Sequence, residues 1–146
     1  MTIDVSRSIQ SAEETRSVPV REIWPAEAHE LLKNGRAVLV DVRTAEERKF
    51  DGFVPDSIHI AWQTGPHFIR NPGFLRELGA KVAKDVALLF ICRSGVRSAD
   101  AAAAAARAGF KQVYNVQSGI EGDPDEQGRR GTVNGWRSEG LPLASH

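Results

Sequence analysis

The stretch that decides the fold reads Val86-Ala87-Leu88-Leu89-Phe90-Ile91-Cys92-Arg93-Ser94-Gly95-Val96-Arg97-Ser98. Its first six residues are apolar and predict a strand that is buried on both faces. An alanine-rich segment follows and ends at Gly109, so residues 96–108 are predicted to form a helix. Cys92, the only cysteine of the chain, therefore lies on a short loop between a buried strand and the N-terminus of a helix.

The segments on either side of this stretch repeat the alternation of strands and helices. This pattern predicts an α/β fold with a central parallel sheet of about five strands and helices on both faces. In such sheets, ligands bind beyond the carboxyl ends of the strands, where Cys92 is expected to lie. The predicted strands are residues 18–23, 37–42, 57–62, 86–91 and 111–116, and the predicted helices are residues 26–33, a short helix capped by Thr44 and Glu47, 74–78 and 96–108.

The length and the charge of the chain limit its class. Its 146 residues suit one domain, which we expect to comprise residues 18–146, after a flexible polar arm at residues 1–17. Lys+Arg and Asp+Glu both number 19. This balance argues against a broad basic face for nucleic acid, so any anion site must be local.

The cysteine count and the hydropathy argue against further classes of protein, namely disulfide-rich, metal-binding and membrane proteins. A single cysteine excludes an internal disulfide framework and a multi-cysteine metal site. Because the four histidines also lack metal-ligand spacing, we expect no metal and no cofactor. No apolar run approaches the roughly 20 residues that span a bilayer, and the first residues carry no apolar signal-peptide core. We therefore expect a cytoplasmic protein with no membrane or nucleic-acid partner.

The loop after Cys92 has the composition of an anion site. Its glycine and two serines let the backbone curl tightly, so that N–H groups point inward and form a concave nest. The helix N-terminus adds positive potential, and Arg93 and Arg97 add two full charges. All of these effects favour the thiolate over the thiol and would hold an anionic substrate against the sulfur. A lone cysteine after an apolar strand is usually an inert core residue, but this surrounding pattern indicates a nucleophile.

The heptapeptide at residues 92–98 resembles the active loop of rhodanese-type sulfurtransferases, which has the form Cys-Arg-Ser-Gly-x-Arg-Ser. The likeness covers about residues 18–143 and implies a single-domain member with the rhodanese-like fold. In the segment that resembles Gly-His-Ile-Pro-Gly-Ala, Phe53 and Asp56 depart from the family pattern. The other segments that carry the resemblance are residues 39–47, 52–60, 109–120 and 135–142.

The resemblance implies a reaction and roles for the loop. Cys92 would be the nucleophile that takes the outer sulfur of thiosulfate or a similar small sulfur anion and passes it, as a persulfide, to cyanide or to a small or protein thiol. Four residues separate Cys92 from Arg97. Related phosphatases and arsenate reductases carry one more, so the shorter loop implies a sulfur substrate. The implied substrate-binding residues are Arg93, Ser94, Gly95, Val96, Arg97 and Ser98.

Other functions remain open beside a thiosulfate sulfurtransferase. A persulfide carrier in a sulfur relay would use the same thiol and would load from a partner protein. A phosphatase or arsenate reductase is disfavoured by the loop length. A catalytically silent binding module is disfavoured by the intact nucleophile at Cys92.

Two charged residues end the strand predicted at residues 37–42. Asp41 and Arg43 are expected to support the architecture around the site, and a structural ion pair is the favoured interpretation. The two arginines of the loop leave alternatives. Arg93 contacts the donor or is merely solvated, and Arg97 turns outward to the substrate or inward to brace the loop.

The largest departure from the family pattern is an apparent insertion at residues 122–134. Its acidic part faintly resembles a calcium loop but lacks the terminal glutamate and the flanking helices, so a solvated turn or hairpin is expected. A sharper hypothesis is that Arg129 or Arg130 reaches the rim of the site and selects the donor or a partner.

Overall fold

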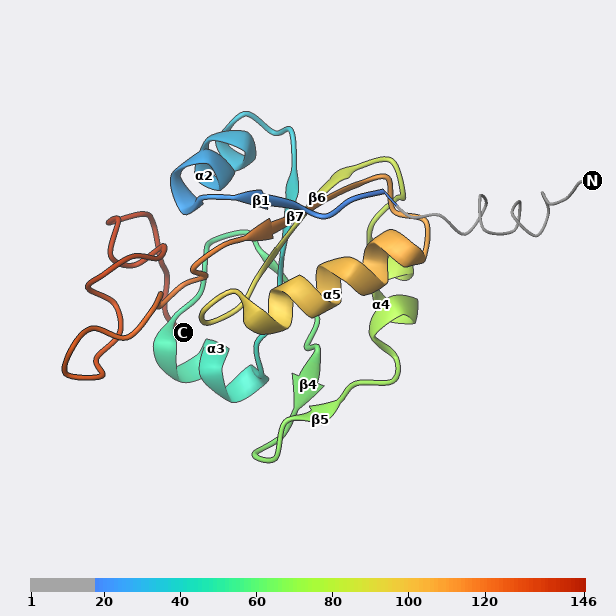
Figure 1. Cartoon of the computed structure of the whole chain (residues 1–146). Coiled ribbons are helices and arrows are strands. Elements are labelled where there is room, and N and C mark those ends of the chain that lie inside the picture. Colours follow the sequence, from blue (N-terminus) through green and yellow to red (C-terminus); the bar gives the residue numbers. More distant parts are fainter. Residues whose placement is uncertain (1–17) are drawn as a thin grey trace, which may run out of the picture.

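The computed structural model describes residues 18–146, so the arm predicted at residues 1–17 lies outside the described residues. Strands and helices alternate along most of the described chain (Figure 1). Their bounds are β1 (Arg21–Ile23), α2 (Pro25–Lys33), β2 (Val38–Asp41), α3 (Ala45–Asp51), β3 (Ile58–His59), β4 (Gln63–Thr64), β5 (Ile69–Arg70), α4 (Phe74–Lys81), β6 (Ala87–Ile91), α5 (Val96–Arg107) and β7 (Gln112–Val116).

The central sheet has five strands in the order β1-β7-β6-β2-β3, and every neighbouring pair is parallel. The predicted α/β class, the strand number and the parallel pairing are therefore confirmed. β6, the predicted buried strand, lies in the middle of the sheet. Its residues 88–91 pair with β2, and its residues 87–90 pair with β7. A short antiparallel hairpin of β4 and β5 stands apart from this sheet and was not predicted.

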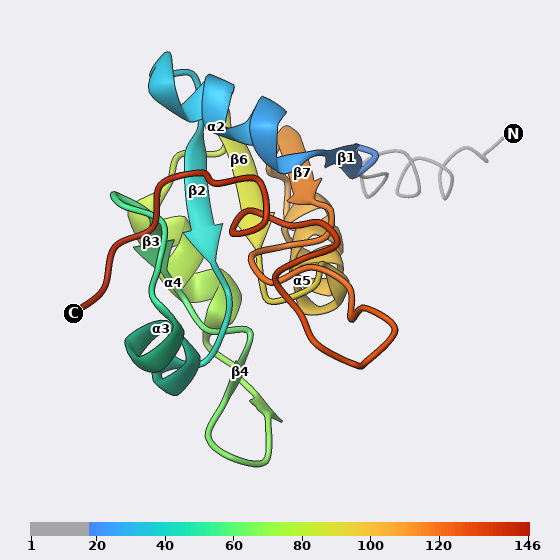
Figure 2. The same ribbon diagram turned by 90° about the vertical axis from the view of Figure 1, so that its left-hand side faces the viewer.

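Each face of the sheet is covered by its own core, because successive strand residues point to opposite faces. On one face, α4 and α5 contribute Phe74, Leu78 and the alanines of α5, which pack against Val40, Leu88 and Phe90 of the strands. The small alanine side chains let α5 approach the sheet closely. Figure 2 shows α4 and α5 on this face and α2 on the opposite one.

The second face is closed by α2 together with the C-terminal segment. Ala28 of α2 and Trp136 pack in one cluster with Leu39, Leu89 and Ile91. Trp136 is fully buried and donates its indole N–H to the carbonyl oxygen of Pro142 at 2.8 Å. The C-terminal segment is thereby fixed across the sheet (Figure 2).

Several element ends differ from the prediction. The strand predicted at residues 57–62 is reduced to β3, although Ile60 N and Trp62 N still donate to the carbonyl oxygens of Asp41 and Val42. The chain leaves the sheet there to enter the β4–β5 hairpin. The helix predicted at residues 74–78 continues through Gly79 to Lys81, and the backbone N–H of Val82 donates to the carbonyl oxygen of Leu78 at its end.

The carboxyl ends of the sheet strands all lie at one edge, since the strands are parallel. α3, the β4–β5 hairpin and residues 122–134 gather at this end (Figures 1 and 2). No helix among the described residues is long and apolar enough to cross a membrane.

Candidate active site

Cys92 follows the last residue of β6, at the carboxyl edge of the sheet, and is 1% exposed. The loop that begins with it ends at Gly95, which precedes α5 with a φ of 100°. Only glycine adopts this backbone conformation without strain. A Cβ at this position would also come within 3.3 Å of the backbone nitrogen of Ser118. The tight loop predicted from the sequence is therefore present.

Three donor groups lie within hydrogen-bond distance of the sulfur of Cys92. The backbone N–H of Gly95 lies 3.1 Å from Sγ, the backbone N–H of Ser98 lies 3.4 Å away, and the Ser98 hydroxyl oxygen lies 3.2 Å away. Two of these donors are backbone groups of the nest and of the first turn of α5. They aim partial positive charge at the sulfur, which stabilises a negative charge there.

Asn115, which the sequence analysis did not single out, completes the surroundings of Ser98. Its Oδ1 lies 2.6 Å from the Ser98 hydroxyl oxygen, and its Nδ2 donates to the carbonyl oxygen of Gly95 at 3.2 Å. The same Nδ2 donates to a carboxylate oxygen of Glu22 at 3.0 Å. Asn115 is 3% exposed, and the available signal for it was a polar residue directly before Val116, near the carboxyl end of β7.

Arg97 turns toward α3 and pairs with Glu47 rather than with the sulfur. Its two terminal nitrogens donate to the two carboxylate oxygens at 2.7 and 2.8 Å. Burial by itself raises the pKa of Glu47, but hydrogen bonds from Arg97 and Thr44 outweigh it and lower the pKa to about 2. The same hydrogen bond raises the pKa of Arg97. Arg97 thus braces the start of α5 against α3.

Glu47 also caps its own helix, as the Thr44–Glu47 pattern predicted. The backbone N–H of Thr44 donates to Glu47 at 3.0 Å, and the backbone N–H of Glu47 donates to the Thr44 hydroxyl oxygen at 3.2 Å. One carboxylate therefore orders both the first turn of α3 and the guanidinium of Arg97.

Asp41 and Arg43 form a buried ion pair at the end of β2. The closest oxygen–nitrogen distance is 2.8 Å, and both side chains are 1% exposed. Arg43 also donates to the carbonyl oxygen of Gly52 at 2.7 Å, and Arg48 donates to Asp41 at 3.0 Å. Within the described residues, the pair makes no hydrogen bond to the cysteine loop. It joins β2 to α3 and to the turn after α3.

The remaining loop residues lie nearer the solvent. Arg93 is exposed, Val96 is 69% exposed, and Ser94 is partly buried. Within residues 18–146, none of these three side chains donates to the sulfur. Their positions leave them available to a molecule that approaches the loop from outside.

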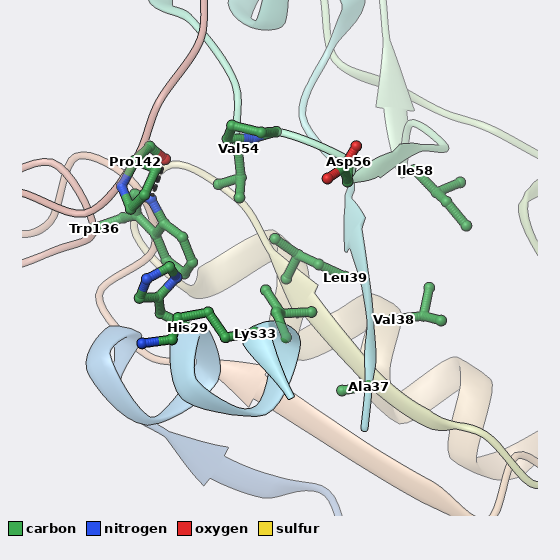
Figure 3. Close-up of a pocket in the computed structure, with 12 residues that line it drawn as sticks. His29, Lys33, Ala37, Val38, Leu39, Val54, Asp56, Ile58, Trp136 and Pro142 are labelled. Atoms are coloured by element: carbon green, nitrogen blue, oxygen red, sulfur yellow. Dashed lines mark hydrogen bonds between the residues drawn. The ribbon is translucent and has the colours of Figure 1, made fainter. Parts of the chain in front are cut away.

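Two hollows show where such a molecule could lie. A cavity of about 470 Å³ beside Glu47 is lined in part by Gly65, Pro66 and Phe68. The guanidinium carbon of Arg97 lies 5.2 Å from the ring centroid of Phe68. A different cavity of about 360 Å³ lies on the face covered by α2, where the rings of His29 and Trp136 meet edge to face (Figure 3). None of residues 92–98 lines either cavity, but Arg97 of the cysteine loop approaches the first one through its contact with Phe68.

Known proteins resemble this chain over most of its length. The family model of the Rhodanese-like domain matches residues 25–123. The crystal structure of Rv0390 from M. tuberculosis is 38% identical, with a TM-score of 0.79, and the match covers 88% of this chain and 100% of that one.

Two curated relatives add to this finding. An uncharacterized protein of Rickettsia prowazekii, RP600, is 36% identical over 130 residues, which are 84% of this chain and 96% of the relative. The thiosulfate sulfurtransferase GlpE of Pseudomonas savastanoi pv. phaseolicola is 36% identical over 101 residues, which are 69% of this chain and 84% of the relative. The chain belongs to the rhodanese-like family of sulfur-transfer domains.

Proposed function

We propose that the protein is a sulfurtransferase that moves a sulfane sulfur from thiosulfate, or a similar small sulfur anion, through a persulfide on Cys92 to cyanide or a thiol. The observation that carries this proposal is that two backbone N–H groups and the Ser98 hydroxyl lie within hydrogen-bond distance of Cys92 Sγ. Cys92 Sγ carries negative charge both as the attacking thiolate and as the thiolate that leaves in the second step, and preorganised donors stabilise such charge.

The reaction consists of two displacements at sulfur. The Cys92 thiolate attacks the outer sulfur of thiosulfate, the new S–S bond forms, and sulfite leaves with the electron pair of the bond that breaks. The acceptor then attacks the terminal sulfur of the persulfide. The S–S bond to Cys92 breaks, the thiolate is regenerated, and cyanide departs as thiocyanate.

The geometry of Arg97 argues against a phosphatase. An arginine that cradles a phosphate must present its guanidinium to the oxyanion, whereas both terminal nitrogens of Arg97 are engaged with Glu47. The likeness to a relative named as a thiosulfate sulfurtransferase supports the sulfur substrate.

The direct test measures thiocyanate formed from thiosulfate and cyanide, together with the mass of Cys92 after incubation with thiosulfate. We expect a gain of one sulfur atom on Cys92 and turnover that Cys92→Ser abolishes. Asp100→Asn, which changes an exposed residue of α5, should keep the wild-type rate and serves as the matched control.

The other outcomes separate the alternatives. Rapid loading from a protein persulfide with slow thiosulfate turnover would replace the proposal with a sulfur carrier. Hydrolysis of an aryl phosphate that depends on Cys92 would replace it with a phosphatase. Loading from no donor would leave a binding module.

A further inference from the structure

Residues 122–134, which the sequence analysis identified as an apparent insertion, are fixed at both ends. The backbone N–H of Asp123 donates to Asn134 Oδ1 at 2.8 Å, and Asn134 Nδ2 donates back to the Asp123 carboxylate at 3.1 Å. The backbone N–H of Gly131 donates to the carbonyl oxygen of Glu121 at 2.7 Å. The segment is therefore a closed loop, since hydrogen bonds join its first residues to its last ones.

The acidic residue Asp125 stabilises the turn of this loop through hydrogen bonds within the loop. The Asp125 carboxylate accepts hydrogen bonds from the backbone N–H groups of Gln127 and Arg129, at 2.9 and 2.8 Å, and from the hydroxyl of Thr132 at 3.3 Å. This matches the predicted turn, and it orients the arginines that follow Asp125. Arg129 is exposed, whereas Arg130 is partly buried and donates to the carbonyl oxygen of Gly122 at 2.6 Å.

Arg130 faces an open cavity of about 460 Å³ that also includes a residue of the cysteine loop. The wall beside Arg130 is joined to that loop, since the backbone N–H of Glu121 donates to the carbonyl oxygen of Arg93 at 2.9 Å. A molecule in this cavity therefore lies beside the loop that carries Cys92. The cavity is lined by Phe50, Asp51, Arg93, Glu121, Arg130 and Arg137.

The charges in the cavity favour an anion. Arg137 is paired with Glu121, with nitrogen–oxygen distances of 2.9 and 3.1 Å. Within residues 18–146, Arg93 and Arg130 form no ion pair with a carboxylate. Arg93 and Arg130 together carry two positive charges against the one exposed carboxylate of Asp51, so the cavity keeps an excess of positive charge. Guanidinium forks match carboxylate and sulfonate oxygens well.

The cavity also suits an organic body rather than an inorganic ion alone. Phe50 is 74% exposed and offers an apolar ring next to the arginines. The volume of about 460 Å³ lies within the usual range for small-molecule pockets, about 300 to 1,000 Å³. Thiosulfate is far smaller than this space, whereas a thiol with a short acidic carbon chain would use both the ring and the charges.

We propose that this cavity binds the acidic tail of the sulfur acceptor, so that the protein prefers thiols that carry a carboxylate or sulfonate, with Arg130 as a specificity-determining residue. This inference rests on the proposed sulfurtransferase function. The acceptor thiolate attacks the terminal, protonated sulfur of the Cys92 persulfide. The S–S bond to Cys92 breaks, Cys92 leaves as the thiolate, and the product is the persulfide of the acceptor.

The test compares three acceptors that differ in charge: mercaptosuccinate, which is anionic, thioglycerol, which is neutral, and cysteamine, which is cationic. Wild-type enzyme loaded with thiosulfate should show the highest kcat/KM with mercaptosuccinate. Arg130→Gln should lower the ratio of kcat/KM for mercaptosuccinate over thioglycerol by about tenfold, through KM, as expected for the loss of one charge-assisted hydrogen bond. Arg129→Gln, the adjacent exposed arginine, should keep the wild-type ratio.

Three further measurements make the result decisive. Added salt should raise the KM for mercaptosuccinate in the wild type more than in Arg130→Gln, because ions screen exposed charges. Thermal unfolding of both variants shows whether the loop at residues 122–134 still folds, and Arg130→Lys, which keeps the charge, should retain part of the preference. Equal ratios in wild type and Arg130→Gln would overturn the inference while leaving the sulfurtransferase intact. Absence of Cys92-dependent transfer to any acceptor, cyanide included, would overturn the function itself.

Discussion

The Ser98 hydroxyl oxygen lies 2.6 Å from Asn115 Oδ1, and it also lies 3.2 Å from Cys92 Sγ. One hydroxyl proton therefore faces two acceptors. The amide of Asn115 is oriented by its donor nitrogen, which points at the carbonyl oxygen of Gly95 and at the Glu22 carboxylate. Its oxygen must then face Ser98, so Asn115 and the sulfur compete for the same proton. Through Ser98, Asn115 acts as a positioning residue for the nucleophile.

Asn115→Asp should reduce the reactivity of Cys92. The substitution keeps the shape of the side chain but replaces its donor by a second acceptor and adds negative charge next to Ser98. Both changes disfavour the thiolate, so alkylation of Cys92 by iodoacetamide at pH 7 should slow by at least about tenfold. Gln112→Glu makes the same amide-to-acid change at the exposed start of β7 and should leave the alkylation rate unchanged. A wild-type rate in Asn115→Asp would show that Asn115 does not govern the sulfur.

Gly119→Ala should displace the backbone of the cysteine loop, against which Gly119 packs. A Cβ at this position would lie 2.5 Å from the carbonyl oxygen of Cys92 and 2.7 Å from the carbonyl carbon of Arg93, and both are backbone atoms that move only with the loop. With the added strain of a φ of 60°, we expect a loss of about 2–5 kcal/mol in the free energy of unfolding. Urea denaturation measures this loss, and sulfur loading of Cys92 should fall with it.

Gly79→Ala supplies the opposite case for comparison. Gly79 lies within α4, and no atom lies within 4 Å of the Cβ that alanine would add. Alanine favours the helix, so this variant should be more stable by about 0.5–1 kcal/mol. Similar losses in Gly79→Ala and Gly119→Ala would show that the close contact with the loop is not the cause.

Asp41→Asn should be strongly destabilising. The carboxylate faces two guanidinium groups, those of Arg43 and Arg48, and Arg43 is only 1% exposed. Removal of the negative charge leaves Arg43 buried without its partner, which costs about 3–5 kcal/mol in comparable pairs. Asp100→Asn, on the exposed side of α5, should change stability by less than about 0.5 kcal/mol. A loss below about 1 kcal/mol in Asp41→Asn would mean that the pair is not a structural support.

The sequence alone predicted the features that depend on neighbours along the chain. The apolar run before Cys92, the alanine helix after it and the capping pattern at Thr44 all lie within a few residues of one another. β6 and α5 were accordingly placed to within one residue of their observed ends. The ion pair of Asp41 with Arg43 spans only two residues and was likewise foreseen as an interpretation.

The contacts of the site that the sequence did not predict join segments far apart in the chain. Asn115 reaches Ser98 because β7 pairs with β6 in a register that places Asn115 opposite Phe90. Arg97 meets Glu47, 50 residues earlier, because α3 and the start of α5 meet at the same end of the sheet. A single sequence specifies such pairings only through the whole fold, so the orientation of Arg97 stayed open until the structure was known.

The pairing of Glu47 with Arg97 makes an acid-sensitive contribution to stability. The pKa of Glu47 is lowered from 4.5 to about 2 in the folded protein. A carboxyl group with a lowered pKa stabilises the folded state above its unfolded pKa, and this contribution disappears as the pH falls toward the folded pKa. The loss should therefore develop between about pH 4.5 and pH 2 and, allowing for solvent screening, should amount to about 1–2 kcal/mol.

Urea denaturation of wild type and Glu47→Gln across this pH range measures that contribution. Glu47→Gln should be less stable than wild type at pH 7, and the difference should shrink as the pH falls from 4.5 to 2, because the wild-type carboxyl becomes protonated while the amide does not titrate. Glu46→Gln, an exposed neighbour in the same turn of α3, should follow the wild-type profile. A constant difference between wild type and Glu47→Gln at all pH values would show that the stabilisation comes from packing of the side chain, since only a charged contact with Arg97 titrates in this range.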